Sequence, residues 1–174
     1  VTPPTAILPC GPVDGIWLGE GLAAFLGVPY AEPPLGAKRF MPPLPASCWS
    51  GRLNASSHGP ECIQSNGKGH EDCLTLDVFT PMLPQSQESG KAPLLPVVVW
   101  IHGGSLIGGS KTSYGPLQAL VKRSVKDEKP FVLLAMNYRL NALGWMSLPE
   151  LASGDYRGVS GNYGLLDQIL ALQW

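Results

Sequence analysis

Residues 96–109 read PVVVWIHGGSLIGG, an apolar run that passes directly into glycines. A short apolar run between proline and glycine is typical of a strand buried on both faces, as in a parallel sheet. The glycines that follow allow backbone N–H groups to approach a ligand beyond the carboxyl end of the strand. Taken alone, the stretch fits an anion-stabilising loop and an ordinary glycine-rich turn equally well.

Strands are expected on both sides of this run, with a helix in between. Residues 74–79 partly alternate in hydropathy and end at Pro81, which predicts a strand. Apolar residues then recur at helical spacing over residues 116–127, and residues 131–136 form a second continuous apolar strand. A strand, a helix and a strand in such a short span predict a βαβ unit with parallel strands.

The remaining segments complete an α/β fold. Proline and glycine are frequent in residues 1–50, which favours short antiparallel strands joined by turns. Residues 51–70, 82–95 and 141–160 are expected to be surface connections, and a last helix begins at Tyr163. The expected fold is therefore short antiparallel N-terminal strands followed by a central, mostly parallel sheet with helices.

Composition excludes several classes of function. The 174 residues are 44% hydrophobic and 14% charged, with a net charge of −1, so nothing favours binding to nucleic acid or to an anionic membrane. Apolar runs stay well short of the roughly 20 residues that span a bilayer. Residues 104–112 resemble a P-loop, but Ser110 separates Gly109 from Lys111, which removes the spacing that phosphate binding needs. No cofactor is implied.

The cysteines and one sequon favour an oxidising compartment. Cys10, Cys48, Cys62 and Cys73 allow three pairings if all are bridged, and no histidine pair completes a zinc site, so no metal is expected. Asn54 begins an Asn-Ala-Ser sequon for N-glycosylation. A secreted or ER-lumenal location is the expectation.

Several charged or titratable residues need an interpretation. Arg39 and Arg139 lie in apolar sequence and each needs a carboxylate partner, but the pattern does not say which one. His102 follows a strand and precedes glycines, so we expect it to shape the loop through its ring hydrogen bonds. His58 and His70 lie in polar sequence and are expected to be exposed.

Six stretches, in this order, make the chain similar to the type B carboxylesterase/cholinesterase family of α/β-hydrolases. They are FLGVPYAEPPLGAKRF (25–40), GPECIQ (59–64), EDCLTLDVFTP (71–81), PVVVWIHGGS (96–105), AMNYRLNALGWMS (135–147) and GNYGLLDQILALQW (161–174). They cover most of residues 1–174, which the resemblance identifies as the incomplete N-terminal portion of one such domain.

The resemblance implies specific roles. The backbone N–H groups of Gly104 and Ser105 would hold the oxyanion of a small-molecule carboxylic ester, with Gly103 and His102 shaping the loop. It also implies a disulfide and two structural salt bridges. These pairs are Cys62–Cys73, Arg39–Glu71 and Arg139–Asp167.

Two departures from the family pattern limit the functional interpretation. Ser105 stands where many active esterases have a third glycine, and its Cβ narrows the conformations open to the backbone. This HGGS version also resembles neuroligin-like members, which are adhesion proteins that bind protein partners and do not hydrolyse esters. The nucleophilic serine of the family, in Gly-x-Ser-x-Gly, and its acid and histidine lie beyond Trp174, so this chain alone is expected to be inactive. The two hypotheses are therefore part of a serine carboxylesterase and a non-catalytic adhesion domain.

Overall fold

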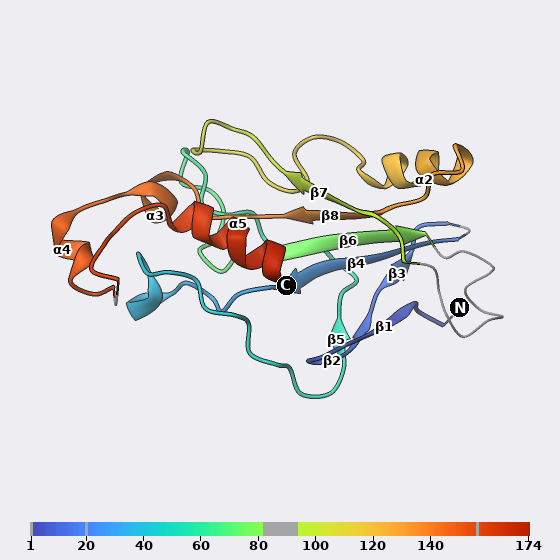
Figure 1. Cartoon of the computed structure of the whole chain (residues 1–174), viewed down its shortest axis with the longest axis horizontal. Coiled ribbons are helices and arrows are strands. Elements are labelled where there is room, and N and C mark those ends of the chain that lie inside the picture. Colours follow the sequence, from blue (N-terminus) through green and yellow to red (C-terminus); the bar gives the residue numbers. More distant parts are fainter. Residues whose placement is uncertain (1, 20, 82–93, 156) are drawn as a thin grey trace.

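The computed structural model describes residues 2–19, 21–81, 94–155 and 157–174. Within these ranges the strands form one five-stranded and one three-stranded sheet (Figure 1). The larger sheet runs in the order β3 (Ile16–Trp17), β4 (Leu22–Pro29), β6 (Thr75–Pro81), β8 (Val132–Met136) and β7 (Val97–Ile101). The smaller sheet contains β1 (Thr5–Leu8), β2 (Gly11–Asp14) and β5 (Leu53–Asn54).

Helices connect and flank the larger sheet. They are the 3₁₀ helix η1 (Gly36–Lys38) and the α-helices α2 (Gln118–Lys126), α3 (Asn141–Trp145), α4 (Pro149–Ala152) and α5 (Tyr163–Gln173). The expected βαβ unit is present as β7, α2 and β8, and β7 pairs with β8 in parallel from Val97–Val132 to Ile101–Met136. The strand–helix–strand prediction for this part of the chain is confirmed.

The larger sheet is mixed in this part of the fold. The β3–β4, β4–β6 and β6–β8 pairs are antiparallel, whereas the expectation was a mostly parallel sheet. Parallel neighbours need a crossover connection, usually a helix. Among the described elements, α2 is the α-helix that lies between two strands of this sheet, so the parallel pairing is found there.

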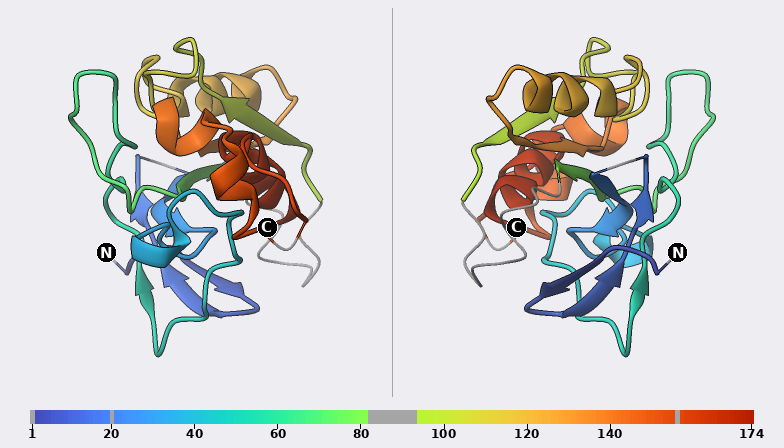
Figure 2. Two further views of the ribbon diagram at one scale, coloured as in Figure 1. Left: turned by 90° about the vertical axis from the view of Figure 1, so that its left-hand side faces the viewer. Right: turned by 90° about the vertical axis from the view of Figure 1, so that its right-hand side faces the viewer.

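Side chains alternate between the two faces of the sheet, and each face has its own core. Leu133 and Ala135 of β8 pack with Val121 of α2 on one face. Leu134 and Met136 belong to the cluster on the other face, which includes residues of α5 and of the smaller sheet. Figure 2 shows α2 and α5 from both ends of the molecule. Because successive side chains of β8 point to opposite faces, this one strand contributes residues to both hydrophobic clusters.

The prediction that residues 97–101 are buried on both faces is wrong. Val97, Val98 and Ile101 are 60%, 43% and 41% exposed. The reason is topological, because β7 is the edge strand and its one neighbour in the described sheet is β8. An apolar run indicates that its residues favour a nonpolar environment, but it does not indicate how many neighbouring strands the strand has.

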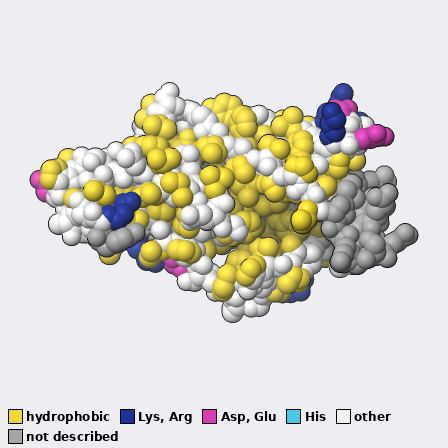
Figure 3. Space-filling model, viewed as in Figure 1, with side chains coloured by type: hydrophobic (Ala, Val, Ile, Leu, Met, Phe, Trp, Pro, Cys, Tyr) yellow, Lys and Arg dark blue, Asp and Glu magenta, His cyan; other side chains and the backbone are white. Residues whose placement is uncertain are grey.

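A second apolar surface lies along α5, where Leu165, Ile169, Leu172 and Trp174 are all at least 43% exposed. Hydrophobic side chains gather over the middle of the face shown in Figure 3. Of the helices in the described ranges, none has the length and hydropathy required to cross a bilayer.

Short elements were missed in the segments expected to be loops. Residues 51–70 contain β5, a two-residue strand that pairs in parallel with β2. Residues 141–160 contain α3 and α4, which are five and four residues long. Elements this short do not complete enough turns or alternations for hydropathy to reveal them. Most of the expected connection at residues 82–95 lies outside the described residues.

Two disulfides close loops in this fold. Cys62 and Cys73 are joined with a Cα–Cα distance of 5.0 Å, and Cys10 and Cys48 with a Cα–Cα distance of 4.7 Å. The second bridge ties the turn between β1 and β2 to the segment before β5. The sequence had left the partners of Cys10 and Cys48 open.

The smaller sheet contains a carboxylate whose titration can be tested. Arg52 and Thr5 donate hydrogen bonds to Asp14, each with a 2.7 Å contact, and they lower the pKa of Asp14 from 3.8 to about 2. A carboxylate with a lowered folded-state pKa stabilises the fold above its unfolded pKa, and this contribution is lost as the pH falls through the folded pKa. The unfolding free energy of the wild-type protein should therefore decrease between pH 3.8 and about 2, and we expect this decrease to be smaller in Asp14→Asn.

Denaturant unfolding at several pH values checks this expectation. Asp72→Asn removes an exposed carboxylate outside the sheets and serves as the control. An unchanged pH dependence in Asp14→Asn would contradict the prediction.

Candidate oxyanion site

Residues 102–113, which we call the glycine loop, follow the carboxyl end of β7. Its tip, residues 103–107, is exposed, whereas Ser110 and Lys111 are buried. The carbonyl oxygen of Gly104 accepts hydrogen bonds from the N–H groups of Ile107 and Gly108, both at 3.0 Å. Among the described residues, no hydrogen bond uses the N–H of Gly104 or Ser105. Two adjacent amide donors are thus unoccupied at the exposed tip.

Two glycines are sterically required by this turn. A Cβ on Gly104 would lie 1.9 Å from the carbonyl oxygen of Gly108, and Gly104 has a φ of 122°. A Cβ on Gly109 would lie 2.3 Å from the carbonyl oxygen of Gly103. Ser105 adopts the left-handed region with a φ of 52°, which costs a non-glycine residue about 1 kcal/mol or more. The serine therefore keeps its N–H but sits in a conformation that suits glycine better.

His102 anchors the start of the glycine loop. Its Nδ1 lies 2.9 Å from the carbonyl oxygen of Gly103, and its ring stacks on Tyr138 with centroids 4.4 Å apart. The hydroxyl of Tyr138 donates to the carbonyl oxygen of His102 at 2.7 Å. Burial lowers the pKa of His102, which favours the neutral imidazole, and a proton on Nδ1 would donate to the carbonyl oxygen of Gly103. This geometry matches a residue that shapes the loop.

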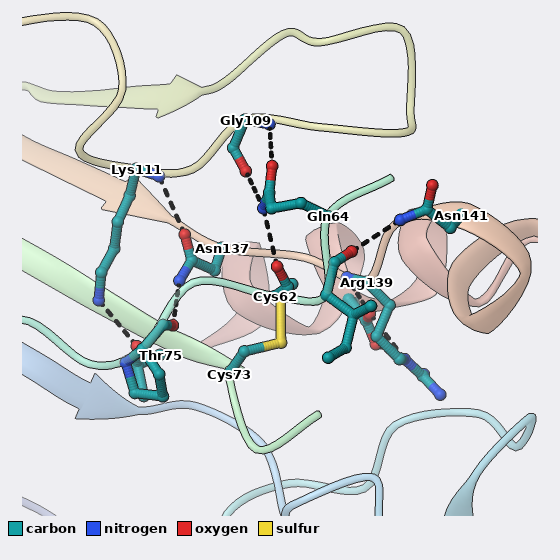
Figure 4. Close-up of a disulfide and its surroundings, with 12 residues drawn as sticks. Cys62, Gln64, Cys73, Thr75, Gly109, Lys111, Asn137, Arg139 and Asn141 are labelled. Carbon is teal, nitrogen blue, oxygen red and sulfur yellow. Dashed lines mark hydrogen bonds and ion pairs between the residues drawn. A yellow bond between two sulfur atoms is a disulfide. The ribbon is translucent and has the colours of Figure 1, made fainter. Parts of the chain in front are cut away.

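Gln64 holds the middle of the glycine loop from the side (Figure 4). Its amide oxygen accepts from the N–H of Gly109 at 2.7 Å, and its amide nitrogen donates to the carbonyl oxygen of Gly109 at 3.0 Å. The same nitrogen donates to the carbonyl oxygen of Cys62 at 2.7 Å. One side chain therefore links the glycine loop to a disulfide-bonded residue.

The far end of the glycine loop is fixed by a buried charge cluster. Lys111 Nζ contacts Asp77 Oδ1 at 2.9 Å and donates to Thr75 Oγ1 at 2.7 Å. The N–H of Lys111 also donates to Asn137 Oδ1 at 2.9 Å. Burial lowers the pKa of Lys111, and the Asp77 carboxylate offsets part of that effect. Lys111, considered above as part of a P-loop pattern, is thus engaged in an ion pair inside the fold.

His58 is more engaged than its sequence suggested. Its side chain is 48% exposed, as expected for a polar segment, but its Nδ1 lies 2.6 Å from Asp77 Oδ2. Asp77 also accepts from the N–H of Gly27, where β4 bulges against β6. The structure therefore brings His58 into the same cluster as Lys111.

The two charge pairs that the resemblance implied are formed. Arg139 donates to Asp167 through Nε at 2.9 Å and Nη2 at 2.8 Å, and both side chains are buried. Burial raises the pKa of Asp167, and the hydrogen bonds from Arg139 offset part of the increase. Arg39 donates to Glu71 through Nε at 2.6 Å, in a more exposed position.

Reasoning from the sequence missed Gln64 and Asn137 as supports of the glycine loop. Their contacts to Gly109 and Lys111 join residues that are 45 and 26 positions apart. No local pattern marks such a contact, although Gln64 does lie in one of the six family-like stretches. In the part of the chain that the structure describes, no group of three or more His, Cys, Asp or Glu side chains could hold a metal ion.

The chain matches a known protein family. The model of the Carboxylesterase family matches residues 2–174. This chain belongs to the carboxylesterase family. It is 42% identical over 163 residues to esterase E4 of Myzus persicae, covering 90% of this chain and 27% of that protein. It is 38% identical over 173 residues to liver carboxylesterase 1 of Oryctolagus cuniculus, covering 89% of this chain and 28% of that protein.

Solved carboxylesterase structures show the same α/β fold. EstA of Aspergillus niger superposes with a TM-score of 0.81 at 31% identity, covering 99% of this chain and 32% of that one. A PNB esterase gives a TM-score of 0.79 at 36% identity, with 99% and 34% covered. The predicted family and fold class are confirmed. The chain spans less than a third of the length of these curated relatives.

Proposed function

We propose that this carboxylesterase-family chain is the N-terminal portion of a serine carboxylesterase and contributes its oxyanion hole. The observation that carries the proposal is the exposed pair of unoccupied N–H groups at Gly104 and Ser105, beyond the carboxyl end of β7. Backbone donors held in a fixed turn stabilise an oxyanion without reorganising during the reaction. The esterase relatives support the same assignment.

In the proposed reaction, a serine outside this chain attacks the carbonyl carbon of a carboxylic ester. The new C–O bond forms as the carbonyl electron pair moves onto oxygen, and a histidine, also outside this chain, takes the serine proton. The N–H groups of Gly104 and Ser105 hold the oxyanion, and each such donor contributes about 3–4 kcal/mol in a comparable protease. Collapse breaks the bond to the alcohol, which receives the proton, and water then hydrolyses the acyl-enzyme.

The adhesion hypothesis gains no support from the relatives named above, which are esterases. Ser105, the feature that suggested it, retains the backbone N–H that an oxyanion requires. A serine at this position is therefore compatible with the proposed function.

Expression of the full-length protein that contains this chain tests the proposal. We expect hydrolysis of a short-chain p-nitrophenyl ester, and loss of activity after treatment with an organophosphate that phosphorylates an active-site serine. A full-length protein that folds but neither hydrolyses the ester nor reacts with the organophosphate would refute the proposed function.

We also propose that the protein enters the secretory pathway and is glycosylated at Asn54. Asn54 and Ser56 of the sequon are both exposed, and two disulfides fit an oxidising compartment. Expression in a eukaryotic secretory host should yield a protein whose apparent mass falls on enzymatic removal of N-glycans. Asn54→Gln should remove the part of that decrease due to this site, and an identical decrease in both proteins would contradict the assignment.

A further inference from the structure

Residues 61–65, which we call the supporting segment, lie beside the glycine loop and contact it repeatedly. Ser110 Oγ donates to Glu61 Oε1 at 2.7 Å, and the N–H of Ser65 donates to the carbonyl oxygen of Ile107 at 2.9 Å. Between these two contacts lie the paired hydrogen bonds of Gln64 with Gly109. The segment therefore follows the loop over several consecutive residues.

Asn141, at the start of α3, completes the connection. Its N–H donates to the carbonyl oxygen of Leu106 in the glycine loop at 2.8 Å, and its side-chain amide donates to the carbonyl oxygen of Ile63 at 2.7 Å. The supporting segment is itself held by the disulfide between Cys62 and Cys73. Figure 4 shows Gln64 between Gly109 and the carbonyl of Cys62, with the disulfide below Cys62 on the side away from Gly109.

Gln64 is the side chain of the supporting segment that hydrogen-bonds to Gly109, just after the tip of the loop. A Cβ built on Gly109 would lie 2.3 Å from the carbonyl oxygen of Gly103 and 2.7 Å from His102 Nδ1, so Gly109 lies close to the residues that precede the proposed donors. We expect a shift of Gly109 to displace those residues. The hydrogen bonds of Gln64 satisfy both backbone groups of Gly109 and so fix its orientation. An unsatisfied backbone pair would be free to turn toward solvent.

We propose that the supporting segment, which the disulfide holds in place, fixes the conformation of the glycine loop and that Gln64 is a positioning residue for the oxyanion hole. The inference rests on the proposed function. Gln64 acts through Gly109 and does not itself contact the reacting atoms. Its removal should therefore weaken transition-state stabilisation while leaving ester binding nearly unchanged.

Gln64→Glu in the full-length protein is the sharpest test, because it preserves size and one acceptor but removes both donations from the amide nitrogen. We expect kcat to fall on the order of 10- to 100-fold, since a displacement of about 1 Å in a positioned group has effects of this size. KM should stay within about threefold. Inhibition by a trifluoromethyl ketone, which mimics the tetrahedral intermediate, should weaken by the same factor as kcat.

Two further measurements separate positioning from folding. Gln64→Asn retains the amide but is one methylene shorter, so it should likewise lower kcat and leave KM nearly unchanged. Gln118→Glu is the matched control, because Gln118 makes no side-chain hydrogen bond among the described residues and begins α2, where a carboxylate is tolerated. Hydrogen–deuterium exchange should accelerate at residues 103–109 in the Gln64 variants and not in β6 or β8.

The outcomes are distinguishable. An inactive wild-type protein would refute the proposed function, and faster exchange at residues 103–109 would still support Gln64 as the support of the loop. Folded Gln64 variants with normal kcat, normal inhibition and normal exchange would overturn the inference. Failure of both variants to fold would also overturn it, because Gln64 would then be required for folding and not for positioning.

Discussion

Under the proposed function, Gly104→Ala is expected to lower kcat of the full-length protein by on the order of 10²–10³-fold, the effect of losing one oxyanion donor. The new Cβ would lie 1.9 Å from the carbonyl oxygen of Gly108, and the φ of 122° is one that L-residues rarely adopt. The peptide must therefore rotate, which turns the donors at Gly104 and Ser105 away from their present directions.

The loss should appear in kcat, because the oxyanion exists in the transition state and not in the bound ester. Steady-state kinetics with a p-nitrophenyl ester measures it. Gly154→Ala is the control, since a Cβ there makes ordinary contacts with Met41 and Leu151, none closer than 3.6 Å and none with the glycine loop. Wild-type kcat in a folded Gly104→Ala protein would show that these N–H groups do not hold the oxyanion.

Arg139→Met is expected to lower the free energy of unfolding by about 3–5 kcal/mol, because it leaves a buried carboxylate without its partner. Asp167 is fully buried and receives three hydrogen bonds from Arg139, one of them from the backbone N–H. The guanidinium also donates to the carbonyl oxygen of Met41 and lies over the ring of Tyr163. Methionine keeps the backbone N–H donor but replaces none of the hydrogen bonds made by the guanidinium.

Denaturant unfolding of the full-length protein measures this effect. Arg123→Met is the control, because Arg123 pairs with Asp127 on the exposed face of α2, where such pairs contribute about 0.3–0.5 kcal/mol. Arg139→Met/Asp167→Asn should recover part of the loss, since it removes the unpaired charge. Equal losses in the Arg139 and Arg123 variants would contradict the interpretation of Arg139–Asp167 as a structural ion pair.

Elements with a long, regular pattern were predictable from the sequence. The helix expected at residues 116–127 is α2, and the strand expected at residues 131–136 is β8. Apolar residues recur at helical spacing in the first segment and form a continuous run in the second, so each pattern determines the type of element. The pattern does not determine burial, since Leu120 and Val125 of α2 are 52% and 41% exposed. The short elements β5, α3 and α4 carry no such repeat and were missed.

The candidate site was predictable only in part. Glycines after a strand marked the position of the loop, and resemblance to a family assigned its role to Gly104 and Ser105. The supports of the loop could not be found in this way. Gln64 reaches Gly109 across 45 residues and Lys111 reaches Thr75 across 36, and neither Gln64 nor Lys111 differs in sequence from an ordinary surface polar residue.

The sequence by itself determined the longer strands and helices and where the glycine loop lies, because these depend on neighbours along the chain. Tertiary structure alone decided that β7 has β8 as its one neighbour in the described sheet, that Cys10 pairs with Cys48, and that Asp77 contacts both Lys111 and His58. These outcomes depend on which distant residues folding brings within a few ångströms. Local hydropathy carries no information about that proximity, since burial and hydrogen bonding are completed by partners far away in the chain.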